Sequence, residues 1–191
     1  KAVGDCNQCH MPLKDSNDFG ADFFSGKDNG LQVHDHLFLG ANTAIAHIRN
    51  KPDIVKAHQD FLKDSVVVEI FGIKEEGKVD GKLLAPIRPK IPSLKSGKEY
   101  LLEVVVRTMK VGHLFSQGTV DSNEIWLDVE LENSGKTIGR SGGLGNGLEV
   151  DPWSHFINVY MLDKDGNRID RRNAEDIFTP LYNNQMPPGS G

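Results

Sequence analysis

Three things are missing from this 191-residue sequence. No apolar run approaches the roughly 20 residues of a membrane-spanning helix, so no transmembrane segment is predicted. There is no excess of basic residues: the formal net charge is −5, whereas domains that bind nucleic acid are usually basic. The chain also begins at Lys1 and lacks a signal peptide, which indicates a processed or truncated polypeptide.

The overall composition is that of a soluble globular protein. Hydrophobic residues make up 38% of the chain and charged residues 26%. The length fits one ordinary domain, or one domain with a small segment attached to it.

Cysteine is scarce as well, and both copies lie in the pentapeptide Cys6-Asn7-Gln8-Cys9-His10. The pattern C-x-x-C-H is the attachment signature of a c-type haem. Two thiols three positions apart can each add to one vinyl group of a porphyrin, and the histidine that follows then ligates the iron. The sequence therefore predicts one haem c, bound through Cys6 and Cys9, with His10 as the proximal iron ligand.

Other uses of this cysteine pair fit less well. A thiol redox pair usually lies at the start of a helix after a buried strand, and no apolar strand precedes Cys6. A zinc site needs four ligands, and no second Cys or His pair at short spacing is evident, although six other histidines leave this open. A disulfide between Cys6 and Cys9 would close a loop too small to stabilise much.

The sequence has two regions, and the first, residues 1–64, holds the motif. Residues 14–30 are rich in Asp, Ser, Asn and Gly, which predicts a loop. Asn42 is placed to cap a short helix over residues 43–48, and a second helix is predicted over residues 52–62, with proline in its first turn. We expect this region to be a haem-binding segment with short helices.

The second region, residues 65–191, has the alternating apolar pattern of β-strands. Strands are expected at residues 66–73, 82–87, 100–107, 124–131 and 156–162. Seven or eight short strands separated by Gly, Pro and Asn are typical of an antiparallel, immunoglobulin-like β-sandwich. The predicted fold class is therefore mainly β: a β-sandwich domain preceded by an N-terminal loop and helical segment that binds haem.

Two loops in the second region have simple structural interpretations. Residues 163–167, Asp-Lys-Asp-Gly-Asn, predict a hairpin turn, and the glutamate that an EF-hand needs at loop position twelve is absent. Residues 142–147 are rich in glycine but do not precede a helix, which predicts a flexible loop and not a phosphate-binding site.

The ligand on the second face of the iron sets haem potential and reactivity, and several histidines are candidates for it. His34 and His36 follow the motif most closely; in a strand they would point the same way, and in a turn only one could reach the iron. His36 is preferred because the apolar run after it suits packing on a porphyrin, and His34 is the alternative. His113 is a further candidate, since loops mounted on a rigid sandwich often carry function.

The other histidines and the methionines are expected to have structural roles. His47 and His58 lie on predicted helices, and His155 opens a predicted strand, where solvated or hydrogen-bonded histidines are common. Met186 is best explained as an apolar residue in a terminal turn, and Met11, next to the proximal histidine, cannot reach the opposite face. Coordination by two histidines is therefore favoured, which predicts a low reduction potential because axial methionine raises it.

Several short motifs extend this picture along the chain. They are Cys6–Pro12, His36–Asn42 and Gly112–Thr119, followed by residues 141–144, 163–169 and 184–189. Together they resemble the C-terminal part of bacterial multihaem c-type cytochromes, with the haem motif as their most specific element. Family members commonly read Gly-His-x-Phe-Pro-Thr/Ser-Gly around His113, where this chain has Ser116-Gln117.

The resemblance implies a covalent haem attached outside the cytoplasm, in a periplasmic or extracellular protein that transfers electrons along a series of haems. It matches His36 to a histidine that follows the last haem motif. Such proteins usually hold several haems, whereas this chain has one motif. It is therefore expected to be a C-terminal piece of a longer cytochrome, or a one-haem subunit of a homo-oligomer or filament. In the second case, a spare histidine such as His113 would ligate the iron of a neighbouring haem-bearing chain.

Three functions follow from these expectations. The leading hypothesis is an electron-transfer cytochrome with one haem held by two histidines. The second is an enzyme subunit with a five-coordinate haem that binds a small nitrogen or oxygen ligand. The third is a β-sandwich that docks a partner cytochrome.

Overall fold

A computed structural model describes residues 5–116, 120, 123–170 and 173–191. The chain divides into two compact units, Lys1–Val66 and Val67–Gly191. Strands account for 31% of the described residues and helices for 15%, and the strands form several small antiparallel sheets. The prediction of a mainly β chain is confirmed at this level. In the part of the chain that the structure describes, no helix is long and apolar enough to cross a membrane.

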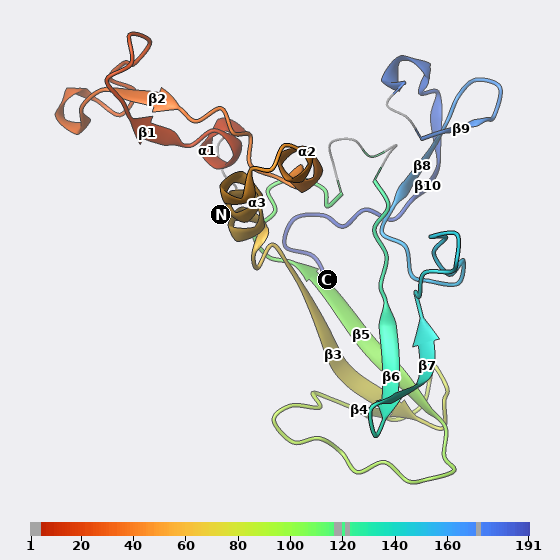
Figure 1. Cartoon of the computed structure of the whole chain (residues 1–191). Coiled ribbons are helices and arrows are strands. Elements are labelled where there is room, and N and C mark those ends of the chain that lie inside the picture. Colours follow the sequence, from red (N-terminus) through yellow and green to blue (C-terminus); the bar gives the residue numbers. More distant parts are fainter. Residues whose placement is uncertain (1–4, 117–119, 121–122, 171–172) are drawn as a thin grey trace. The chain divides into compact units, whose positions relative to one another are not determined.

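Both predicted helices are present in the first unit, together with a single helical turn at the C-x-x-C-H motif. The helices are α1 (Asn7–His10), α2 (Thr43–Ile48) and α3 (Pro52–Leu62). Asn42 occupies the N-cap position of α2, and Pro52 stands in the first turn of α3, where its missing N–H is not needed. Helices α2 and α3 pack against each other (Figure 1).

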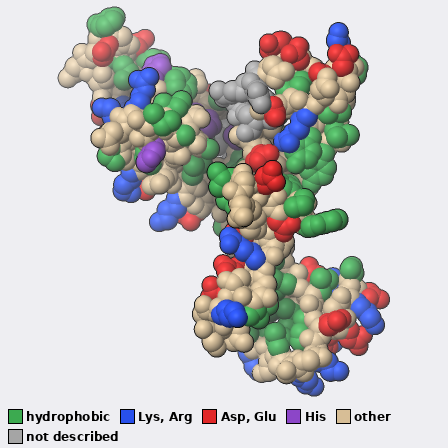
Figure 2. Space-filling view, turned by 45° about the vertical axis from the view of Figure 1, so that its right-hand side comes forward, with side chains coloured by type: hydrophobic (Ala, Val, Ile, Leu, Met, Phe, Trp, Pro, Cys, Tyr) green, Lys and Arg blue, Asp and Glu red, His purple; other side chains and the backbone are tan. Residues whose placement is uncertain are grey.

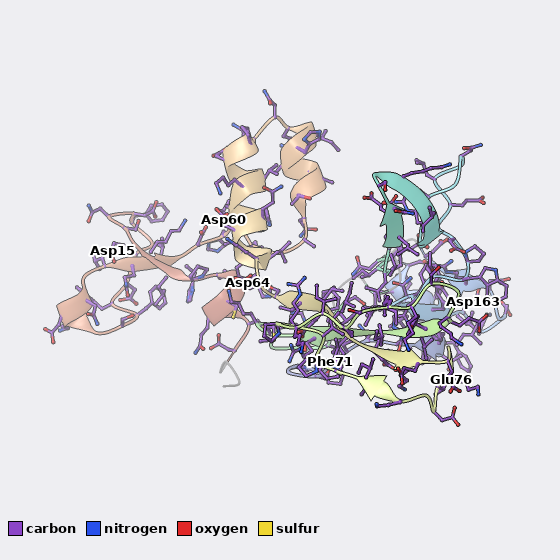
Figure 3. The ribbon with its side chains drawn as sticks, turned by 90° about the horizontal axis from the view of Figure 1, so that it is seen from below. Asp15, Asp60, Asp64, Phe71, Glu76 and Asp163 are labelled. Atoms are coloured by element: carbon purple, nitrogen blue, oxygen red, sulfur yellow. The ribbon has the colours of Figure 1, made fainter. Side chains whose placement is uncertain are left out.

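A small hairpin follows the C-x-x-C-H motif where the sequence predicted only a loop. It consists of β1 (Leu13–Asp15) and β2 (Gln32–His34), with Leu13 opposite His34, and a 3-10 turn, η1 (Lys27–Asn29), lies between them. Figure 3 labels Asp15 at the end of β1. Strands of three residues are too short to show an alternating pattern, so the sequence did not reveal them.

The second unit contains eight strands among its described residues, in agreement with the expected seven or eight. They are β3 (Val66–Glu75), β4 (Leu83–Leu84), β5 (Tyr100–Thr108), β6 (Val129–Asn133), β7 (Lys136–Ser141), β8 (Val159–Leu162), β9 (Arg168–Ile169) and β10 (Thr179–Asn183); a 3-10 turn, η2 (Ala174–Asp176), precedes the last. The sheet orders are β4-β3-β5, β6-β7 and β10-β8-β9 (Figure 1). The finer expectation, an immunoglobulin-like sandwich, stays a prediction.

Two strands differ most from their predicted extents. In the segment predicted as a strand over residues 124–131, only the last three residues belong to β6. The preceding part lies beside the segment before β8: Trp126 forms an isolated bridge with Phe156, and the N–H of Ile157 donates to the carbonyl of Ile125 at 2.8 Å. β4 is short because Pro86 follows it closely, and proline has no N–H for a strand ladder.

The C-terminal tail is fixed to the second unit by hydrogen bonds. Thr108 is 2% exposed; its N–H donates to the carbonyl of Ser190 at 2.9 Å, and its hydroxyl donates to that of Pro187 at 2.7 Å. The N–H of Phe115 donates to the carbonyl of Met186 at 2.9 Å. Met186 thus pairs with the loop after β5.

Asn158 is the polar centre of the second unit's small core. Asn158 is 1% exposed, and its neighbours along the chain, Ile157 and Val159, are buried as well. Its Oδ1 accepts the backbone N–H of Ile125 at 2.7 Å, and its carbonyl accepts the N–H of Asn184 at 3.0 Å. Asn158 therefore joins the segment before β8 to the segment around Ile125 and to the chain after β10 at Asn184.

We expect Asn158→Ala to destabilise the protein by about 2 kcal/mol, because it leaves the partly buried Ile125 N–H without its acceptor. This corresponds to a fall in Tm of roughly 4–8 °C for a protein of this length, measured by thermal denaturation followed by circular dichroism. Asn146→Ala, at an exposed position in the glycine-rich loop, is the matched control and should change Tm little. Equal melting temperatures for the two variants would contradict this role of Asn158.

The β8–β9 hairpin is closed by Asp163, as predicted from the turn residues (Figure 3). Its Oδ1 accepts the N–H groups of Asp165 at 2.9 Å and Asn167 at 2.8 Å, and its Oδ2 accepts the side-chain N–H of Asn167 at 3.0 Å. Gly166 adopts a positive φ of 83° in the turn, a conformation that favours glycine. These bonds, led by those to Asn167, lower the pKa of the Asp163 carboxyl below its ordinary value.

This lowered pKa predicts a dependence of stability on pH. Because the folded state favours the ionised carboxylate, its contribution is present above the ordinary pKa of 3.8 and is lost as the pH falls through the lower folded value. Asp163→Ala should therefore flatten the decline in Tm between about pH 5 and pH 2. Thermal melts across that range test this, with Asp165→Ala as a control expected to keep the slope of the unsubstituted protein.

Many large apolar side chains are exposed in both units (Figure 2). The chain has an accessible surface of 14433 Å². A compact protein of its mass, 21.1 kDa, exposes about 9,000 Å², and two separate compact units of these lengths would expose about 11,000 Å². The accessible surface of this chain exceeds both reference values, so the excess is present even when the two units are counted as separate.

Candidate haem-binding site

The C-x-x-C-H motif folds into one helical turn. Cys6 is the N-cap residue of α1, and its carbonyl accepts the N–H of Cys9 at 3.3 Å and that of His10 at 3.0 Å. Residues three apart in a helix lie on the same side, so both thiols are presented together. Both are free thiols; Cys6 is exposed and Cys9 is half-buried. The turn thus displays two nucleophilic groups side by side without a disulfide between them.

His10 is held by a hydrogen bond from its ring. Its Nδ1–H donates to the carbonyl oxygen of Leu39 at 2.5 Å, which makes Nε2 the nitrogen that carries the lone pair. The ring of Phe61, on α3, lies 5.5 Å from the His10 ring, centroid to centroid. Metal-binding histidines usually donate their second ring N–H to a carbonyl or carboxylate in this manner, because it fixes the tautomer and the ring orientation.

His34 and His36 line one pocket next to the motif. The pocket has a volume of about 460 Å³, and Met11, Phe24 and Val33 supply apolar parts of its wall. It contains both sequence-predicted candidates for the second iron ligand, together with the residue that follows His10.

The two histidines are held differently. His34 ends β2 and is half-buried; its Nδ1–H donates to the Met11 carbonyl at 2.7 Å, and its ring meets that of Phe24 edge-on at 5.1 Å. His36 lies in the turn after β2 and is exposed; its Nδ1–H donates to the carbonyl of His34 at 2.8 Å. Both rings therefore carry their lone pair on Nε2, but the His34 ring is the more tightly enclosed.

Asp35 holds the turn that carries His36. Its carboxylate accepts the N–H of Leu37 at 3.0 Å and forms an ion pair with Lys14 of β1 at 2.6 Å. The hydrogen bond from Lys14 is the main cause that lowers the pKa of Asp35, opposed by partial burial and aided by the Leu37 N–H. The ionised carboxylate thus ties the turn to the hairpin.

Of the remaining histidines, those of the first unit lie on helices and those of the second in loops. His47 is exposed on α2, whereas His58 is 4% exposed on α3. The Nδ1–H of His113 donates to the carbonyl of Leu114 at 2.9 Å, and Nε2 of His155 lies 3.5 Å from the side-chain nitrogen of Asn184. His113 is part of the second unit and His10 of the first.

Two parts of this site had no clear signal in the sequence. The Leu39 carbonyl is a backbone group, and no residue pattern marks it as the acceptor for His10. His58 and Phe61 lie three residues apart and therefore on the same side of α3, but this spacing does not show that the side faces the motif. Residues Gln117–Thr119 of the loop that resembles the cytochrome motif lie outside the described residues.

The donor set fits a covalently bound haem better than the alternative metal site. Within the described residues, no group of three or more His, Cys, Asp or Glu side chains could hold a metal ion, so a protein-only zinc site has no support there. Two free thiols on one helical turn and a histidine with a fixed tautomer are the groups that a c-type haem requires. Cys6 and Cys9 would hold the porphyrin, and His10 the iron.

Comparisons with protein-family models, with curated proteins and with solved structures found no match to this chain. Its function therefore has to be inferred from its residues and their geometry.

Proposed function

We propose that this chain is a c-type cytochrome, or part of a multihaem cytochrome, that transfers electrons through one covalently bound haem. Cys6 and Cys9 would form the thioether bonds, and His10 would be the proximal ligand. The observation that carries the proposal is the hydrogen bond from His10 Nδ1–H to the Leu39 carbonyl, because it leaves the lone pair on Nε2 of a histidine that shares one helical turn with two free thiols.

His36 is proposed as the distal ligand, with His34 as the alternative. Both line the pocket next to the motif, but the His34 ring is enclosed by Met11 and Phe24, whereas the His36 ring is exposed on a short turn. The exposed ring is the better placed to move onto an iron. Two histidine ligands leave no open iron site for a substrate, which favours electron transfer at a low reduction potential.

The same proposal includes a location and partners. Haem c in the cytochromes that this chain resembles is attached outside the cytoplasm, so we propose a periplasmic or extracellular protein. Electrons would pass to haems of neighbouring chains, in a homo-oligomer or filament, and His113 would ligate a neighbour's haem. The large exposed apolar surface supports such partners, since burial of apolar area is the main driving force of association.

A docking role for the second unit is a further candidate, and the same surface favours it. All the residues of β7 are exposed, as are most of β6. Because an isolated two-stranded ribbon is at best marginally stable in water, a partner that covers it would stabilise it. In this reading the immunoglobulin-like sandwich is completed or covered by a partner cytochrome.

The visible absorption spectrum of the protein tests the main proposal. The chain would be produced with a haem-attachment system in the periplasm, and haem that survives acid extraction would establish the covalent bond. A low-spin reduced spectrum that does not change on addition of CO is the expected result. A high-spin spectrum that shifts with CO would instead support the five-coordinate enzyme, and a chain without covalent haem would leave the docking role.

A further inference from the structure

We propose that His58 is a positioning residue that holds the Leu39 carbonyl against His10 and thereby sets the strength of the proximal ligand. This inference rests on the proposed function, because it concerns the residue that would ligate the iron. His58 lies on α3 and is 4% exposed, so its contacts are made away from bulk water.

His58 contacts Gly40, the residue next to Leu39, whose carbonyl accepts the ring N–H of His10. Its Nδ1 lies 2.8 Å from the carbonyl oxygen of Gly40 and 3.0 Å from the Gly40 nitrogen. One ring nitrogen cannot donate to the oxygen and accept from the N–H in the same tautomer, but either bond fixes Gly40. Gly40 follows Leu39 directly, so restraining Gly40 also restrains the Leu39 carbonyl.

Helix α3 contacts the His10 environment at a second point. Phe61 lies one turn after His58 on the same side of α3, and its ring is 5.5 Å from that of His10. Helix α3 thus supports His10 in two ways. The Phe61 ring lies against the His10 imidazole, and His58 restrains the Leu39 carbonyl that accepts the His10 ring N–H.

The same geometry places His58 away from the side on which a ligand would bind. The two ring nitrogens of an imidazole point in different directions, and Nδ1 of His10 points at Leu39. The Leu39–Gly40 backbone and the His58 bound to it are therefore on the Nδ1 side, whereas an iron would be on the Nε2 side. His58 serves as a support for the proximal ligand and does not compete with His34 or His36.

The chemical consequence concerns the electron-donating power of His10. A strong hydrogen bond from Nδ1–H raises the basicity of the ligating imidazole, and a more basic ligand favours ferric over ferrous iron. If the Leu39 carbonyl is free to move, this bond weakens and the reduction potential rises.

The test compares two substitutions at position 58 in the haem-loaded chain. His58→Asn keeps a polar side-chain atom near the position of Nδ1, whereas His58→Leu removes it and keeps the apolar bulk. We expect His58→Leu to shift the ferric-to-ferrous equilibrium about tenfold, which is a rise of about 59 mV for a one-electron couple. His58→Asn should stay near the potential of the unsubstituted protein. His47→Ala, at an exposed position on α2, is the matched control and should change nothing.

A second readout separates positioning from a general loss of structure. The exchange rate of the His10 ring N–H, followed by NMR, should increase in His58→Leu and not in His58→Asn. If the leucine variant does not fold, His58→Gln takes its place, because its amide reaches the position of Nε2 instead of Nδ1; it should shift the potential while His58→Asn does not. Equal potentials and exchange rates in all position-58 variants that carry haem would overturn the positioning role and leave the proposed function intact. Absence of covalent haem from the unsubstituted chain would overturn both.

Discussion

Replacing both Cys6 and Cys9 with alanine is expected to abolish covalent attachment of haem. The thiols lie on one helical turn and are free, and they are the chain's two cysteines, so no other side chain can form a thioether. The intact mass of the purified protein should lose the increment of one haem, and acid extraction should leave no colour with the polypeptide. Each single substitution should reduce the attachment to one bond.

The double serine variant, Cys6→Ser with Cys9→Ser, is the matched control for shape. It keeps polar side chains of similar size at both positions but cannot form thioethers, so it should lose the haem as completely as the alanine variant. Circular dichroism of both variants should show the strand content of the unsubstituted chain, because the turn buries neither cysteine. Covalent haem in either double variant would refute the assignment of Cys6 and Cys9.

Replacing His36 with alanine is expected to convert the haem from six-coordinate and low-spin to five-coordinate and high-spin. The proposed distal ligand is then missing, and CO should bind to the open position and shift the reduced spectrum. His36→Met should instead keep six coordination and raise the reduction potential by on the order of 0.1 V, a part of the roughly 0.8 V that axial ligands span. Spectroelectrochemistry measures both effects.

His34→Ala is the control variant that distinguishes between the two candidate ligands. It removes the other histidine of the same pocket, so it should leave the low-spin spectrum in place if His36 is the ligand. The opposite outcome, a change with His34→Ala and none with His36→Ala, would move the assignment to His34. Asp35→Ala should reduce the low-spin spectrum only in part, because it frees the turn on which His36 lies without removing the imidazole.

Much of the local structure followed from the sequence because it depends on short-range rules. Asn42 and Pro52 marked the starts of α2 and α3, and the Asp163–Asn167 turn marked the β8–β9 hairpin. Pro52 acts through its missing N–H and Asp163 through a carboxylate that satisfies nearby backbone donors, so both signals act over a few residues. The side chain of Asn42 makes no capping hydrogen bond, although the residue stands at the start of α2. The extents of the strands were less predictable, as in residues 124–131, because pairing partners far along the chain decide where a ladder begins and ends.

The C-x-x-C-H motif by itself predicts the cofactor and three of the residues that would hold it. That chemistry depends on spacing within five residues, so no long-range information is needed. Tertiary structure alone decided what surrounds the motif. It brought Leu39 and Phe61 into contact with His10 and placed His58 against Gly40, next to Leu39. It also placed His34 and His36 in one pocket. Backbone carbonyls carry no sequence signature, and contacts between a turn and a helix some fifty residues later exist only once the chain has folded.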